Sequence, residues 1–252
     1  DTELPEWVTS AGDSIAIPYN GSVARLNFGA LVARRARRWL EAGDFDILHI
    51  HEPITPSVGM LTLQAASAPV VGTFHAAMDR SLARELLSPA TVPLMEKLSA
   101  RIAVSEEARR TLIQYHGGDA VVIPNGVDHR RFANAADDTE PAMAARRRWR
   151  RELGHYVLAI GGIEPRKGSI DLLEAYALLR AEAPDLALVF AGGETLFDYR
   201  DYRAEFDRRR TELGIDPIVL GPVADDDLPS LVAGCDVFAF PSSKEGFGLA
   251  AM

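Results

Sequence analysis

The sequence predicts an α/β fold of doubly wound parallel sheets, arranged as two domains. Short apolar runs of four to six residues alternate with helical stretches of about 10 to 15 residues along most of the chain. This alternation is typical of parallel strands joined by crossover helices. The apolar periodicity is lost once, over residues 133–144, and we expect a linker there. The first domain would then span residues 1–132 and the second residues 145–252.

The composition is that of a globular protein, with 47% hydrophobic and 25% charged residues among 252. A net charge of −9 argues against nucleic acid as the main partner. The single cysteine, Cys235, excludes a disulfide framework and fits a reducing compartment. No stretch has the ~20 apolar residues that span a bilayer, and no signal-peptide pattern opens the chain. The sequence therefore predicts a cytoplasmic protein without a membrane span.

In the first half, strands and helices alternate regularly. The expected elements are a strand at 14–17, a helix at 28–42, a strand at 46–51, a helix at 57–66, a strand at 70–74, a helix ending near residue 98, a strand at 102–105, a helix at 106–115 and a strand at 120–123. Ligands of such sheets bind at the carboxyl ends of the strands. Those ends are marked by His51, His75, Ser105 and Asn125. A lone histidine is more often structural than catalytic, but the small residues after His75 favour a functional role.

Residues 28–42 have the pattern of a basic amphipathic helix. A helical projection places Phe28, Val32, Ala36, Trp39 and Leu40 on one side. The other side carries Arg34, Arg35, Arg37 and Arg38. Two compatible interpretations remain open: a solvated face on a helix that packs against a sheet, or a surface that binds anionic lipid.

The second half repeats the alternation. The expected elements are a short basic helix at 146–153, a strand at 155–160, a helix at 169–181, a strand at 186–191, a helix at 199–213, a strand at 218–221, a helix at 225–233, a strand at 236–240 and a loop at 241–248 that opens one more helix. The first of these strands runs into Gly161-Gly162, with Arg166 and Lys167 just before a helix start. Such a turn either binds phosphate or merely exposes its basic residues to water.

Together, the two sheet domains, His75 at a strand end, GGIEPRKG at 161–168 and KEGFGL at 244–249 resemble the retaining GT-B glycosyltransferases that use nucleotide sugars. Over about residues 15–134 the resemblance is closer to the phosphatidylinositol mannosyltransferases. The segments that carry it are 17–26, 43–46, 48–53, 63–66, 73–75 and 123–128. Beyond residue 135 the match is to the wider family, and residues 192–199 resemble a different branch.

The resemblance implies transfer of mannose from GDP-mannose to the inositol of phosphatidylinositol, with retention of configuration. The protein would act peripherally on the inner face of the cell membrane, with an anionic lipid surface as partner and without cofactor or metal. One alternative is a GT-B transferase with another nucleotide sugar and a soluble acceptor. A second is a non-catalytic module that binds nucleotide sugar or lipid, and a sugar-nucleotide epimerase is less favoured.

The same resemblance assigns the site residues. The implied catalytic residues are His75, Lys167 and Glu245. The implied donor-binding residues are Gly161, Gly162, Glu164, Arg166, Lys167, Val223, Asp225, Glu245, Phe247 and Gly248. Arg25 and Arg80 would meet the acceptor, and Arg34, Arg35, Arg37 and Arg38 the membrane.

Three departures from the family pattern stand out. Gly162 occupies a position where the family commonly has Arg. The second Glu of the family's glutamate pair would follow Met252, and the family's first strand with its glycine-rich loop is absent. Both domains are therefore expected to be incomplete here, and the polypeptide as given is expected to be inactive.

Overall fold

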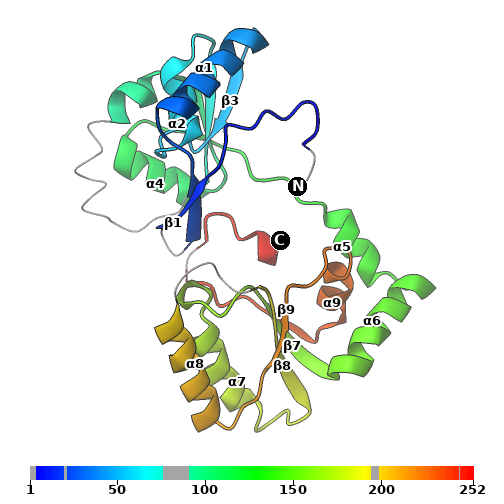
Figure 1. Cartoon of the computed structure of the whole chain (residues 1–252). Coiled ribbons are helices and arrows are strands. Elements are labelled where there is room, and N and C mark those ends of the chain that lie inside the picture. The colour runs from blue at the N-terminus through cyan, green and yellow to red at the C-terminus, as the bar shows by residue number, and fades with distance from the viewer. Residues whose placement is uncertain (1–3, 20–21, 76–90, 194–198, 244) are drawn as a thin grey trace. The chain divides into compact units, whose positions relative to one another are not determined.

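The computed structural model describes residues 4–19, 22–75, 91–193, 199–243 and 245–252, with backbone alone for 17–19 and 22–25. The chain forms two compact units, Asp1–Asn125 and Gly126–Met252 (Figure 1). Each unit is built around its own four-stranded parallel sheet. These two sheets confirm the predicted α/β fold class, and each unit is described by itself below.

The sheet of unit 1 has the strand order β3-β4-β5-β6, all parallel. Its strands are β3 (Leu48–His51), β4 (Val70–Phe74), β5 (Leu98–Ala103) and β6 (Val121–Val122). Its helices include α1 (Ala30–Gly43), α2 (Val58–Ala65) and α4 (Glu106–His116). Residues 91–96 are also helical. A separate antiparallel hairpin pairs β1 (Ile15–Tyr19) with β2 (Ser22–Leu26).

The core of unit 1 lies between this sheet and its helices. Leu63 of α2, Val70 of β4 and Leu112 of α4 are almost completely buried in it. From α1, Val32 and Ala36 are buried. Ser105 caps α4, because its Oγ accepts a hydrogen bond from the Ala108 N–H at 3.1 Å. One of the four polar strand-end residues therefore has a structural role.

The sheet of unit 2 has the order β10-β7-β8-β9, again all parallel. Its strands are β7 (His155–Ile160), β8 (Leu186–Ala191), β9 (Ile218–Gly221) and β10 (Val237–Ala239). The helices are α5 (His129–Ala136), α6 (Glu140–Leu153), α7 (Ser169–Leu179), α8 (Arg200–Glu212) and α9 (Leu228–Gly234). Short 3₁₀ turns cover Pro165–Lys167 and Leu249–Ala251.

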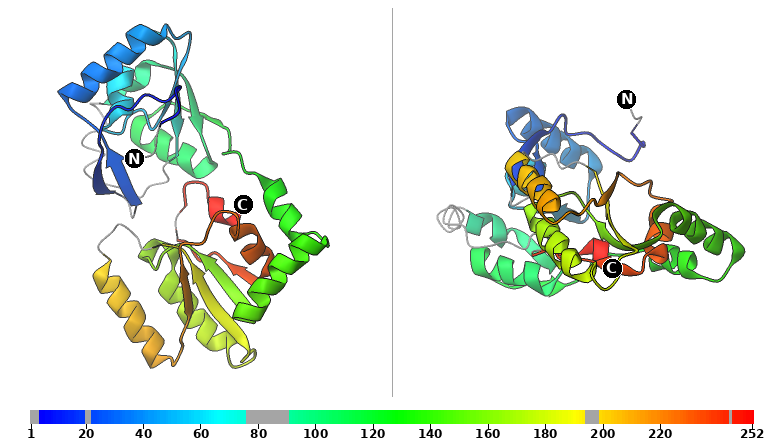
Figure 2. Two further views of the ribbon diagram at one scale, coloured as in Figure 1. Left: turned by 45° about the vertical axis from the view of Figure 1, so that its right-hand side comes forward. Right: turned by 90° about the horizontal axis from the view of Figure 1, so that it is seen from below.

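Helices cover both faces of this second sheet (Figures 1 and 2). Successive residues of a strand point to opposite faces, so Val157 of β7 packs toward α7 and α8 while Leu158 packs toward α6 and α9. Both side chains are buried. A strand buried on both faces reads as a continuous apolar run, which is why β7 and β8 were predicted with their exact observed bounds from sequence.

Three elements differ from the expectation. The strand expected at 102–105 lies at Leu98–Ala103, and the hairpin strand β2 was not expected. The segment 133–144, expected as an irregular linker, is largely helical. The chain divides into its two units between Asn125 and Gly126 instead. Alanine-rich sequence has high helix propensity without a regular apolar stripe, and Thr139 with Pro141 forms a helix start. None of the helices in the described part of the chain is long and apolar enough to cross a membrane.

Candidate functional site

The turn after β7 is shaped by glycines that let two backbones and a lysine side chain come close. The Gly161 N–H donates to the Ala191 carbonyl at 2.8 Å, and Gly161 has φ +134°, in the region that favours glycine. A β-carbon at position 161 would lie 3.2 Å from Cε of Lys167. The alkyl chain of Lys167 therefore lies across this turn.

The turn after β8 touches the turn after β7. A β-carbon on Gly192 would lie 2.4 Å from the carbonyl carbon of Gly161, a distance that real β-carbons do not show. At Gly162, a β-carbon would lie 3.1 Å from the Gly193 carbonyl oxygen. This contact is tight, so a side chain at 162 would require the neighbouring turn to shift by a few tenths of an ångström.

Three charged side chains meet beside these glycines. Lys167 Nζ lies 2.6 Å from Glu245 Oε1, and Arg166 NH1 lies 3.0 Å from the same oxygen. Their side chains are only 17 to 27% exposed. Burial of Glu245 raises its carboxyl pKa, but the hydrogen bond from Lys167 and the charges of Lys167 and Arg166 outweigh this and leave the pKa lowered. Two cations thus share one ionised carboxylate.

Helix α7 begins at Ser169, two residues after Lys167, and adds a positive helix end to this group. Gly168 precedes the helix with φ +62°, and a β-carbon there would lie 2.4 Å from the Pro241 carbonyl oxygen. Ser243 N–H donates to the Arg166 carbonyl at 3.0 Å. The loop after β10 therefore packs against the turn after β7 and hydrogen-bonds to it. This packing keeps Glu245 in contact with Lys167.

The remaining predicted donor residues lie along the same sheet edge. Glu164 is nearly buried and lies 3.9 Å from Arg166. Phe247 and Gly248 lie in the loop after β10, where Gly248 has φ +79°. Val223 is half-buried after β9, and Asp225 is exposed in the turn before α9. Since β9 is two strands from β7, the last two residues extend the edge without joining the Lys167 cluster.

In unit 1, three histidines gather where β3 and β4 end. His51 Nδ1 lies 2.7 Å from His75 Nε2, and the two rings have centroids 5.0 Å apart. The ring of His49 stacks on that of His51 with centroids 4.7 Å apart, and its Nε2 is 2.7 Å from Thr73 Oγ1. His49 was not singled out from sequence, although alternation along a strand places His49 and His51 on one face.

These imidazoles disfavour positive charge. Burial lowers the pKa of His51, and the nearby His49 and His75 lower it further, against the opposing effect of Glu52. Burial lowers the pKa of His75, with His49 again adding to the effect. A cluster of stacked imidazoles cannot carry several charges at close range. Both shifts therefore favour the neutral form of His51 and of His75.

The arginines of α1 are exposed, as predicted: Arg34, Arg35, Arg37 and Arg38. Arg35 also donates to the Ala11 carbonyl at 2.9 Å. The expected apolar face is only partly buried, because Phe28 is 55% and Trp39 is 38% exposed, and Leu31 is exposed beside them. Trp39 packs on Phe45 instead of entering the core. The helix thus presents cations together with apolar side chains to solvent.

Two predicted acceptor residues are not placed. Arg80 lies outside the described residues, and for Arg25 the structure describes only the backbone, in β2. Asn125 is the last residue of unit 1. A cavity of about 440 Å³ in unit 1 is bounded by residues 9–11, α1, α2 and β3, and both His49 and His51 line it.

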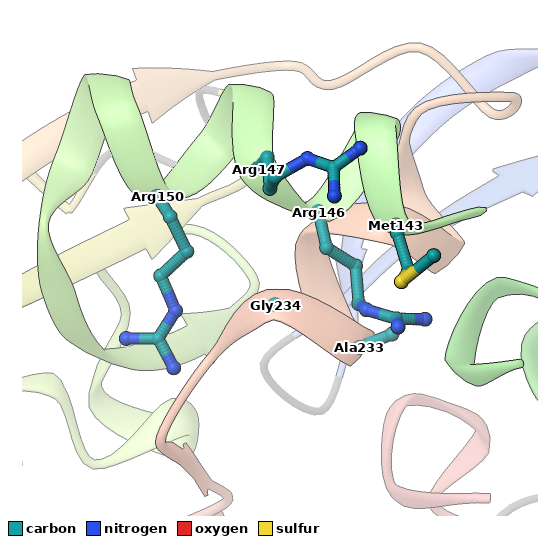
Figure 3. Close-up of a pocket in the computed structure, with 6 residues that line it drawn as sticks. All are labelled: Met143, Arg146, Arg147, Arg150, Ala233 and Gly234. Carbon is teal, nitrogen blue, oxygen red and sulfur yellow. The ribbon is translucent and has the colours of Figure 1, made fainter. Parts of the chain in front are cut away.

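A smaller pocket of unit 2, about 270 Å³, is lined by three arginines of α6 (Figure 3). None of the predicted donor residues is among the residues that line it. Arg146 points toward Ala233 and donates to the Ala135 and Asp137 carbonyls. Arg150 pairs with Asp236, and Arg147 with Glu140. Each guanidinium therefore has a protein partner. Arg146 and Arg150 tie α6 to residues outside the helix, whereas Arg147 pairs within α6.

Two family models match the chain. Glycosyltransferase Family 4 matches residues 2–131, and Glycosyl transferases group 1 matches residues 144–252. The chain belongs to glycosyltransferase family 4. This confirms the resemblance seen in sequence, and the two observed sheets agree with the GT-B fold of solved glycosyltransferases.

Among curated relatives of this family 4 chain, the phosphatidyl-myo-inositol mannosyltransferase of Mycolicibacterium smegmatis is 41% identical over 98% of this chain and 60% of the relative. The D-inositol 3-phosphate glycosyltransferase of Salinispora arenicola is 30% identical over 92% of this chain and 55% of the relative. The crystal structure of Anabaena HepE with UDP and glucose matches with TM-score 0.65 and 23% identity, over 85% of this chain and 57% of that one. The chain thus spans about 60% of the length of its first relatives.

Proposed function

We propose that this chain is part of a retaining glycosyltransferase that moves mannose from GDP-mannose to the inositol of phosphatidylinositol. The observation that carries the proposal is the Lys167, Arg166 and Glu245 cluster beside the glycine turn and the start of α7. Fixed cations and a helix start are suited to a diphosphate. The mannosyl donor and lipid acceptor are supported by the names of the relatives that are about 40% identical.

In the proposed reaction, a diphosphate oxygen replaces Glu245 as the partner of Lys167. Charge builds up on the diphosphate as the bond to the sugar breaks, and Lys167, Arg166 and the positive end of α7 stabilise it there. Glu245 is then available to accept a hydrogen bond from a sugar hydroxyl. His75 would lie beside the acceptor hydroxyl, which attacks from the face that the leaving group departs from, so that configuration is retained.

The proposed acceptor places the protein on an anionic membrane surface at the inner face of the cell membrane. Four arginines on α1 are exposed next to the apolar side chains of Leu31 and Trp39. Each basic residue near anionic lipid contributes ~1 kcal/mol, and apolar side chains add interfacial burial. These features of α1 support the proposed peripheral binding.

The proposal is tested by transfer of radiolabelled mannose from GDP-mannose to phosphatidylinositol vesicles. The assay uses the 252-residue chain and, in parallel, the full open reading frame wherever it extends further. We expect lipid-linked product from the extended protein and none from residues 1–252 alone. An extended protein that neither transfers mannose nor hydrolyses the donor would contradict an enzymatic role and favour a module that only binds nucleotide sugar or lipid.

A second candidate is transfer to a soluble inositol phosphate, with the same or another nucleotide sugar. It is supported by the relatives that are named D-inositol 3-phosphate glycosyltransferases. The discriminating variant replaces all four α1 arginines with serine, and its matched control replaces Arg208, Arg209 and Arg210 of α8, which form ion pairs on the surface of unit 2. Loss of vesicle binding and lipid transfer in the first variant alone supports the lipid acceptor. Unchanged transfer to a soluble acceptor supports the second candidate.

A further inference from the structure

Two consecutive residues at the end of β3 hold His75 by its ring and by its backbone. The parallel register places His51 opposite Thr73, so His75 leaves β4 within reach of the His51 ring. Next along the chain, the Glu52 N–H donates to the Thr73 carbonyl at 2.8 Å. The Glu52 carboxylate accepts the His75 N–H at 2.7 Å. Glu52 adopts φ +51° to make both contacts, a conformation that non-glycine residues seldom take.

We propose that His51 is a positioning residue for the transfer reaction, which orients the imidazole of His75 and selects its tautomer through the contact between His51 Nδ1 and His75 Nε2. The proposal rests on the proposed function, because it takes His75 as the side chain beside the acceptor hydroxyl. His51 itself acts only through His75.

The number of ring protons decides which tautomers the two histidines can adopt together. A neutral imidazole has one N–H and one acceptor nitrogen. The 2.7 Å contact therefore needs one ring to donate and the other to accept. With Nε2 of His75 engaged by His51, Nδ1 is the nitrogen through which His75 acts on a substrate. If His51 donates, Nδ1 of His75 carries the proton, and if His51 accepts, Nδ1 of His75 is an acceptor. The tautomer of His51 therefore sets that of His75.

The surroundings of His51 keep it in place for this role. The ring of His49 stacks on one side of it, and His49 in turn contacts Thr73 Oγ1. Neither contact reaches the hydrogen-bonded nitrogen of His75. The lowered pKa values of His51 and His75 favour the neutral pair that the hydrogen bond requires. His49 therefore provides a matched control, since it touches His51 without bonding to His75.

The first test is NMR of the 252-residue chain with ¹⁵N-labelled histidine at pH 7.5. In the wild type, the ring nitrogens of His75 should show one dominant tautomer. His51→Phe keeps a stacking ring but removes the hydrogen bond, so we expect His75 to become a mixture of tautomers. His51→Gln, which restores a hydrogen-bonding group, should return part of the preference, and His49→Gln should leave it unchanged. Identical His75 nitrogen shifts in wild type and His51→Phe would overturn the proposal.

The second test uses the transfer assay on the extended protein. His51→Phe should lower kcat by about 10- to 100-fold with acceptor KM changed less than twofold, since it misplaces a group that acts in the reaction rather than in binding. His51→Gln should recover part of that loss. Full kcat in His51→Phe together with a changed tautomer would refute the catalytic part. If the wild type transfers nothing, the proposed function fails, while the NMR result still decides whether His51 positions His75.

Discussion

The two sheets of this protein each have four parallel strands, but their carboxyl edges are built in opposite ways. In unit 1, the edge carries stacked neutral imidazoles that share hydrogen bonds, around His51 and His75. In unit 2, the edge carries opposite charges in contact, around Lys167 and Glu245, on turns that only glycine fits. The first kind of edge suits hydrogen bonding to a hydroxyl, and the second suits an anion. The same fold thus offers two different chemistries through the residues that follow its strands.

The largest expected effect comes from breaking the glycine contact in unit 2. Gly192→Ala would place a β-carbon 2.4 Å from the backbone of Gly161, and we expect a loss of ~3 kcal/mol of unfolding free energy together with weaker nucleotide binding. Gly126→Ala is the control, because nothing lies within 4 Å of a β-carbon there. Urea unfolding, followed by Trp149 fluorescence, measures the stability of both variants. Equal stability of the two variants would show that the two turns do not pack as described.

The second prediction removes the charge of Lys167, the lysine that contacts Glu245 in unit 2. Lys167→Ala should lower transfer by the extended protein by about 10²- to 10³-fold, because a fixed charge at the leaving group is lost. Lys97→Ala, which removes an exposed lysine bonded to the Gln64 carbonyl in unit 1, should leave transfer within twofold. Nucleoside diphosphate affinity, measured by calorimetry, should fall for Lys167→Ala alone. Unchanged turnover in Lys167→Ala would contradict the proposed role of Lys167 in the reaction.

The carboxylate of unit 2 should act in the opposite direction on diphosphate binding. Glu245→Gln removes the negative charge that competes with a diphosphate for Lys167 and Arg166. We therefore expect a nucleoside diphosphate to bind about 3- to 10-fold more tightly, while transfer falls because the sugar loses its carboxylate partner. Glu174→Gln, at an exposed ion pair with Arg209 on the α7 and α8 surface, is the control. Weaker diphosphate binding in Glu245→Gln would mean that Glu245 organises the cations rather than competing for them.

Local sequence pattern was enough to predict several strands and the residues that follow them. Continuous apolar runs predicted β7 and β8, and the rule for strand ends found His51 and His75. A glycine pair followed by two basic residues before a helix start pointed to the Gly161 turn. What it missed depends on distant contacts. Nothing local reveals that Glu245 reaches Lys167, that Gly193 crowds Gly162, or that His51 bonds to His75, because these pairs are separated by 24 to 78 residues. Only the family resemblance brought Glu245 and Lys167 into one predicted site.

The smallest expected effect concerns pH, and it separates the two edges directly. The pKa values of His51 and His75 are lowered by folding, so the unfolded chain binds more protons below the ordinary value of 6.5. Stability of unit 1 should therefore fall as the pH drops from 7.5 to 5.5. In unit 2, the lowered pKa of Glu245 means that its contribution is lost only at more acid pH.

This difference is measured by urea unfolding at several pH values, with tryptophan fluorescence from one unit at a time. Trp149→Phe leaves Trp7 and Trp39 to report unit 1, and replacing those two leaves Trp149 for unit 2. We expect the midpoint of unit 1 to decrease toward pH 5.5 and that of unit 2 to hold. Replacing both His51 and His75 with Phe should flatten the slope of unit 1, because no imidazole of that pair is then left to take up a proton. Equal slopes in the two units before that replacement would contradict the view that neutral imidazoles distinguish the first edge from the second.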